Sequence, residues 1–151
     1  MADAVRRLDQ VHGLDATIAH ELAIRAMSLN ARLVASLLTE MVWCESFEEL
    51  PPEPLVMFDP WRVLSAKAAL PGNVLPVGWH VTSDSIAGWI ARQLKADELV
   101  LLKSALPDGV GSIAEAAEQG YCDTHLPVVW HQAVRCVNFR SRDFAECRLA
   151  K

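Results

Sequence analysis

The apolar run Leu99–Leu102 restricts the fold of this chain more than any other feature. Four consecutive branched apolar residues, followed by Lys103, suit a strand that is buried on both faces, and such strands are typical of parallel sheets. Other short apolar runs share this character. The pattern therefore predicts strands at 41–44, 55–58, 98–103 and 133–138.

Helical patterns separate these runs. Apolar spacings of three and four predict helices over 2–11 and 16–38. Asp59 and Pro60 are typical of a helix start. Shorter helices are expected at 46–50, 59–70, 82–95 and 112–119, with a last one in the tail from Arg142. The alternation predicts an α/β fold, a three-layer sandwich whose central sheet is mostly parallel. With 151 residues and no internal repeat or linker, we expect a single domain over 1–151.

Composition excludes several classes of partner. The formal net charge is −5, which argues against a broad surface for nucleic acid or anionic membranes. No apolar run approaches the length that spans a bilayer. The first residues carry charges and no signal-peptide pattern, so the four cysteines are expected to be reduced thiols of a cytoplasmic protein.

A polar loop, Thr82–Ser85, directly precedes the helix predicted at 82–95. In open α/β sheets ligands bind beyond the carboxyl ends of strands, and helix N-termini favour anions. Lys103 ends a strand and is expected at the same edge, so a phosphate site is chemically sensible. Asp84 would repel phosphate, and its useful roles are to hold a lysine or to accept a magnesium contact. The alternative is that these residues cap a helix and that Lys103 is a solvated strand end.

The segment HVTSDSIAGWIARQLKADELVLLKSALPDGV resembles the amino acid kinase family, which includes bacterial uridylate kinase, acetylglutamate kinase and aspartokinase. The resemblance lies in four phrases: Thr82-Ser83-Asp84-Ser85, Lys95-Ala96-Asp97, Leu99–Lys103 and Asp108-Gly109-Val110. The stretches ADAVRRLDQVHGL and AHELAIRAMSLNARLVASLL are similar to helical segments of the small uridylate-kinase-like branch linked to methanofuran or tetrahydromethanopterin synthesis.

The resemblance implies transfer of the γ-phosphoryl group of ATP, with Mg²⁺, to a small acceptor in C1-carrier cofactor biosynthesis. Asp84 would be the catalytic aspartate that organises lysines around the phosphoryl group. Thr82 and Ser83 would lie near the acceptor or the transferred phosphate. His80 is the histidine nearest this loop and is a candidate contact for phosphate or acceptor.

The nucleotide side of the site is implied by the same resemblance. Lys103 and Ser104 would lie beside the nucleotide, and Asp108 and Gly109 would form the turn that flanks its base or ribose. The family's habits also imply a homo-oligomer, and we expect neither nucleic acid nor membrane as a partner.

The chain departs from the family in its glycines. The family's first strand carries a lysine and a Gly-Gly-Ser loop, and a second glycine-rich loop follows; both hold phosphates or acceptor. The glycines of this chain form neither loop, and they stand at 13, 72, 78, 88, 109, 111 and 120. Because glycine lets backbone N–H groups approach phosphate, we expect little kinase activity without these loops. We also expect the fold to lack the family's first strand. Three explanations for the missing segment stay open: a start codon assigned too late, a degenerate remnant, or a genuine short form that acts as a ligand-binding or assembly module.

A zinc site is a further alternative. The candidate ligands are Cys122, His125, His131 and Cys136, but their spacing matches no common structural zinc pattern, so we expect no metal ligand here. Trp79 flanks the polar loop and could shape an aromatic acceptor pocket, although core packing is the more frequent role of such a residue.

Overall fold

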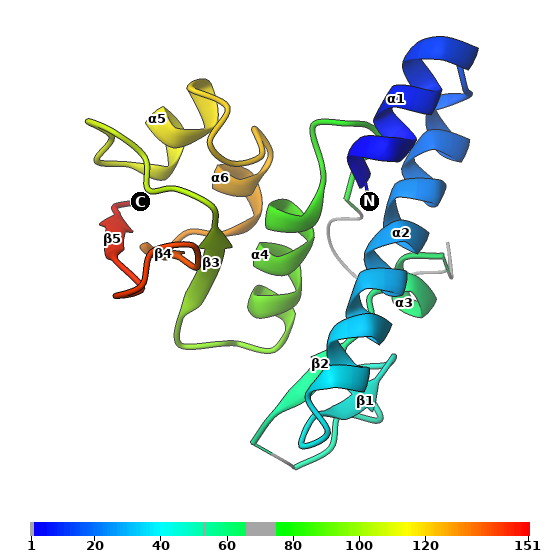
Figure 1. Ribbon diagram of the computed structural model, residues 1–151, viewed down its shortest axis with the longest axis horizontal. Coiled ribbons are helices and arrows are strands. Elements are labelled where there is room, and N and C mark those ends of the chain that lie inside the picture. The colour runs from blue at the N-terminus through cyan, green and yellow to red at the C-terminus, as the bar shows by residue number, and fades with distance from the viewer. Residues whose placement is uncertain (1, 53, 66–74) are drawn as a thin grey trace. The chain divides into compact units, whose positions relative to one another are not determined.

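A computed structural model describes residues 2–52, 54–65 and 75–151, and the chain forms two compact units, Met1–Trp79 and His80–Lys151 (Figure 1). Each unit combines helices with a small sheet, so the fold is mixed α/β as the sequence predicted. The single domain over 1–151 stays a prediction.

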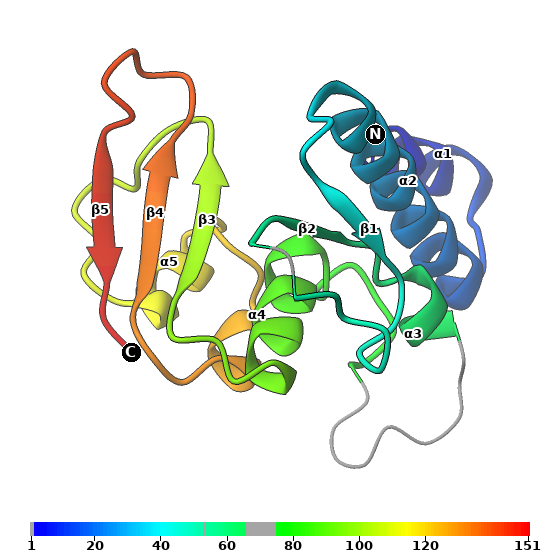
Figure 2. The same ribbon diagram turned by 90° about the horizontal axis from the view of Figure 1, so that it is seen from below.

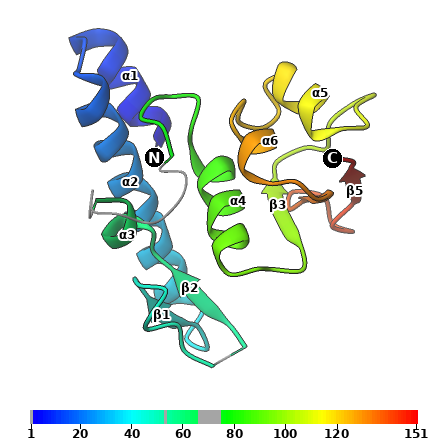
Figure 3. The ribbon, with the colours of Figure 1, turned by 180° about the vertical axis from the view of Figure 1, so that it is seen from behind.

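The first unit is built around two helices that lie side by side in Figures 1 and 3, α1 (Ala2–His12) and α2 (Ala16–Leu37). Both match the helices predicted from the sequence. The carboxylate of Asp15 accepts the N–H groups of Thr17 and Ile18, which fixes the start of α2. After α2 come β1 (Val42–Cys44), β2 (Val56–Phe58) and α3 (Trp61–Ser65).

The strands β1 and β2 pair in parallel, and both were predicted. The helix predicted at 46–50 is wrong, because the hydroxyl of Ser46 bonds both the carboxylate and the backbone N–H of Glu48 and forms a turn. Pro51 and Pro52 then prevent helical extension. In α3, Asp59 accepts the N–H of Trp61 at 3.0 Å, which confirms its capping role. The rest of that predicted helix, 66–70, lies outside the described residues.

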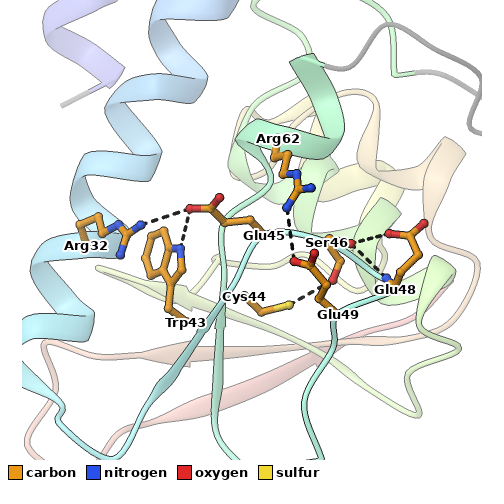
Figure 4. Close-up of polar contacts among 8 residues, drawn as sticks. All are labelled: Arg32, Trp43, Cys44, Glu45, Ser46, Glu48, Glu49 and Arg62. Atoms are coloured by element: carbon orange, nitrogen blue, oxygen red, sulfur yellow. Dashed lines mark hydrogen bonds and ion pairs between the residues drawn. The ribbon is translucent and has the colours of Figure 1, made fainter.

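Arg32 of α2 and Arg62 of α3 reach the segment that follows β1 (Figure 4). The guanidinium of Arg32 lies 3.5 Å from the ring centroid of Trp43. Glu45 accepts from Arg32 at 3.1 Å and from the indole N–H of Trp43 at 2.7 Å. Arg62 donates to Glu49 at 3.3 Å. These contacts hold α2 and α3 against the end of the small parallel sheet.

The second unit contains a sheet in the order β3-β4-β5 with helices beside it (Figure 2). Its helices are α4 (Ser83–Gln93), α5 (Ile113–Glu118) and α6 (Leu126–Val129). Its strands are β3 (Leu99–Lys103), β4 (Val134–Asn138) and β5 (Glu146–Leu149). The first two strands are parallel and the last is antiparallel. The predictions of a helix at 82–95, a strand at 98–103, a helix at 112–119 and a strand at 133–138 are thereby confirmed to within two residues at each end.

The apolar run of β3 is not buried on both faces. Leu99 and Leu101 are buried, whereas Leu102 points the other way and is 67% exposed. An unbroken apolar run therefore did not reveal which face of the strand would be covered.

The helix predicted after Arg142 is also wrong, because this segment returns as β5. Asn138 and Ser141 form the turn: the side chain of Asn138 accepts the N–H of Arg140 at 2.9 Å, and the Ser141 hydroxyl accepts the N–H of Ala145 at 2.8 Å. Burying Leu149 completely favours the hairpin over an exposed terminal helix.

Gly88 sets the close approach of α4 to α6. A Cβ at this position would lie 2.8 Å from Cδ1 of Leu126 and 3.3 Å from Cβ of Trp130. Both neighbours are buried and have little room to move. We therefore expect Gly88→Ala to lower the free energy of unfolding by about 1–3 kcal/mol, measured by urea denaturation. Gly111→Ala is the matched control, because the nearest atom to its Cβ lies 3.8 Å away; equal losses in the two variants would contradict this account.

Candidate functional site

The carboxyl end of β3 brings together two of the residues singled out in the sequence. The Nζ of Lys103 donates to Oδ2 of Asp84, in the first turn of α4, at 2.6 Å. Both side chains are largely buried, with 21% and 13% exposed respectively. The ammonium also lies 5.3 Å from the ring centroid of Tyr121. Lys103 is therefore held by a carboxylate and an aromatic face, and it is not a freely solvated strand end.

Burial dominates the electrostatics of Asp84. It raises the pKa of this carboxyl above its ordinary value of 3.8. The hydrogen bond and charge of Lys103 oppose the rise, and the nearby charge of Asp123 adds to it. The ion pair thus compensates only part of the cost of keeping an ionised carboxylate here.

Asp123 is the second organising group of the site, and it was absent from the sequence predictions. Its carboxylate accepts three hydrogen bonds: from the N–H of Thr82 at 2.8 Å, from the Thr82 hydroxyl at 2.6 Å and from the N–H of Ser85 at 2.9 Å. The side chain of Thr82 makes no cap bond of its own. Thr82 is the N-cap residue of α4, as the helix-cap interpretation expected, but the carboxylate of the distant Asp123, and not the side chain of Thr82, accepts the N–H groups at the helix start.

The remaining predicted site residues lie around this core. His80 is exposed, and its ring meets the ring of His125 edge-on with centroids 6.2 Å apart. Ser83 is exposed at the start of α4. Ser85 is fully buried, and its hydroxyl has no hydrogen-bond partner among the described residues.

The predicted nucleotide side is an exposed loop. Ser104 follows Lys103 directly, and Asp108 and Gly109 lie in an exposed turn, with Gly109 at φ +65°. The hydroxyl of Tyr121 donates to the carbonyl of Ala105 at 3.0 Å. In residues 75–151, no hydrogen bond or ion pair joins Ser104, Asp108 or Gly109 to Asp84 or Lys103.

Weak local signals explain why Asp123 and Tyr121 were missed. They stand in the stretch YCDTH, in which the sequence pattern offers only Cys122 and His125 as candidates, for zinc. Burial, together with the charge of Asp84, raises the pKa of the Cys122 thiol to about 11, so this thiol stays protonated at neutral pH. In the part of the chain that the structure describes, no group of three or more histidines, cysteines or acids is placed to hold a metal ion.

A comparison of the chain with protein-family models, with curated proteins and with solved structures finds no match. Among the described helices, none has both the length and the apolarity that crossing a membrane requires.

The three bonds to Asp123 make a testable statement about stability. Asp123→Ala leaves two N–H groups at the start of α4 without their acceptor, so we expect a loss of about 2–3 kcal/mol in the free energy of unfolding, measured in urea. Asp123→Asn keeps one carbonyl oxygen and should lose less. Asp108→Ala removes an exposed aspartate and serves as the control; a loss as large as that of Asp123→Ala would show that charge alone is responsible.

The raised pKa of Asp84 predicts a pH dependence. The folded state holds the Asp84 proton more tightly than the unfolded state, so a stabilising contribution is lost as the pH rises from 3.8 through the raised pKa. Asparagine does not titrate. Asp84→Asn should therefore gain stability relative to the natural protein as the pH rises from about 4 to about 7, in urea unfolding at a series of pH values. A difference that does not change with pH, or that changes in the opposite direction, contradicts the assignment.

Proposed function

We propose that this protein is a small-molecule kinase, or a kinase-like protein, of the amino acid kinase type, which binds the phosphates of ATP beside Lys103. The observation that carries the proposal is the 2.6 Å contact between Lys103 and Asp84 at the carboxyl end of β3. An aspartate that holds a lysine at this position is what the family resemblance implies. The fold supports the same class, since the site lies where a parallel strand ends and a helix begins.

The side chains have separate roles in this proposal. Lys103 offsets the negative charge of the phosphates, and Asp84 orients the ammonium without acting as a base. Asp123 fixes Thr82 and Ser85, so the loop in front of α4 is rigid before a ligand arrives. His80 and Ser83 are exposed beside it, and they are the proposed contacts of the acceptor.

ATP and Mg²⁺ fit this arrangement if the metal ion arrives bound to the nucleotide. The described residues form no ready-made metal cage, so the Mg²⁺ would be held mainly by the phosphates and water, as is usual for this ion. In the reaction the acceptor oxygen bonds to the γ-phosphorus as the bond to the β,γ-bridging oxygen breaks, ADP leaves with that electron pair, and the acceptor proton passes to solvent. Ser104, Asp108 and Gly109 lie on the loop that would face the nucleotide.

Finer features belong to the same proposal. They are a three-layer amino acid kinase-like sandwich lacking the first strand, an acceptor used in C1-carrier cofactor synthesis, and a homo-oligomer. A stripe of exposed apolar side chains along α2 supports self-association, and its most exposed members are Leu29, Leu33 and Leu37 at 58%, 54% and 72%.

A non-catalytic ligand-binding or assembly module is the second candidate, and one observation favours it. The ammonium of Lys103 and the start of α4, which would receive the phosphates, are already bonded to carboxylates of the same chain. Such a module would bind a ligand or partner without turnover.

Isothermal calorimetry with ATP and Mg²⁺ tests the proposal. We expect binding by the natural chain, and a loss of at least about tenfold in affinity for Lys103→Gln, because one charge-assisted phosphate contact disappears. Lys151→Gln removes the same charge at the exposed C-terminus and should leave affinity unchanged. The absence of binding, or equal binding by both variants, would overturn the site. Binding without ADP formation in the presence of candidate acceptors would favour the non-catalytic module.

A further inference from the structure

A cleft of the unit His80–Lys151 lies at the end of its sheet opposite to Lys103. It has a volume of about 390 Å³ and is formed by the end of α4 with the turn that follows, residues 91–97, and by the end of α6 with the segment before β4, residues 129–132. Both segments lead into the amino ends of parallel strands, whereas Lys103 stands at the carboxyl end of β3. In Figure 2 the connections from α4 to β3 and from α6 to β4 meet at the same end of the sheet. The cleft is therefore separate from the site around Asp84.

The lining of this cleft is cationic in an acidic protein. Arg92 and Lys95 line it with a single carboxylate, Asp97, and with the imidazole of His131, although the whole chain has a formal net charge of −5. Arg92 and Lys95 are exposed, and within the described residues neither forms an ion pair. Arg135 on the neighbouring strand β4, in contrast, forms ion pairs with Glu98 and Glu146.

The backbone of Lys95 gives a second reason to single out this cleft. After α4, the N–H of Lys95 bonds the carbonyl of Arg92 at 3.1 Å and the N–H of Ala96 bonds the carbonyl of Ala91 at 2.8 Å. This pair of bonds needs a left-handed backbone at the first of the two donors, which is Lys95, and glycine is the usual residue at that position. The chain instead places a lysine there at φ +52°, one of only two described non-glycine residues with positive φ. A strained backbone position thus carries a charged side chain into the cleft.

We infer that this cleft binds a small organic anion through a phosphate or carboxylate group. Arg92 offers a planar pair of donors that matches either group, and Lys95 adds a point charge. Gln132 supplies a neutral amide beside them, and Ala91, Ala96 and Val129 give an apolar wall for the hydrocarbon part of the ligand. Asp97 disfavours a highly charged polyanion and suits a ligand that also carries a hydroxyl or amine.

The test is a titration of the ¹⁵N-labelled chain followed by amide chemical shifts, with glycerol 3-phosphate as the phosphate probe and succinate as the carboxylate probe. We expect saturable shifts at residues 91–97 and 129–132 with at least one probe. The two probes together decide whether the cleft recognises a phosphate ester or a carboxylate.

Lys95→Gly separates binding from folding. Glycine relieves the positive φ, so this variant should unfold at a higher temperature than the natural chain, while its affinity for the probe falls about tenfold. Lys151→Gln is the matched charge control and should bind as the natural chain does. Unchanged affinity in Lys95→Gly, or no saturable shift with either probe, overturns the inference. Shifts confined to residues 82–85 and 103 would also overturn it while supporting the proposed kinase-type site, so the two proposals fail separately.

Discussion

The carboxylate of Asp123 decides where α4 begins, and the geometry of the candidate site follows from that helix. Two of its three hydrogen bonds go to backbone N–H groups of Thr82 and Ser85, which the first turn of a helix cannot satisfy internally. A negative charge at this end also complements the helix dipole. Because the start of α4 is fixed, Asp84 is the second residue of the helix, and its carboxylate contacts the ammonium of Lys103. Orientation of the lysine is therefore a consequence of the cap.

This arrangement limits how a phosphate could bind. A charge-assisted hydrogen bond contributes roughly 1.5–3 kcal/mol, so a ligand gains little by displacing either Asp84 or Asp123 from its donors. The ammonium of Lys103 has three protons, and Asp84 accepts from it on one side. A phosphate would therefore join the existing contacts of Lys103 as an additional acceptor. Such a site is preorganised, because the lysine needs no reorientation when the ligand arrives.

The sequence predicted those parts of the fold that depend on local pattern. The segments around α2, α4 and β3 have strong periodicity or apolar runs, and simple strand-to-helix topology was enough to place Lys103 near Asp84. Asp123 could not be found this way, because it is about forty residues from the helix that it caps and no spacing rule links them. The two wrong helices, at 46–50 and after Arg142, share another cause. Serine and asparagine side chains bond the backbone there and form turns that helix propensity does not register.

The two ends of the sheet in the second unit differ in how their charges are compensated. At the carboxyl end, the carboxylates of Asp84 and Asp123 compensate the charge of the lysine and the N–H groups of the helix start, so the polar groups there have partners within the chain. At the amino end, Arg92 and Lys95 stand in solvent with one carboxylate beside them. Solvated cations cost little to maintain, but they also add little stability, and a strained lysine backbone reduces stability further. The fold therefore explains the charged groups at the carboxyl end of the sheet by their partners within the chain. It does not explain Arg92 and Lys95 at the amino end, and a bound anion would.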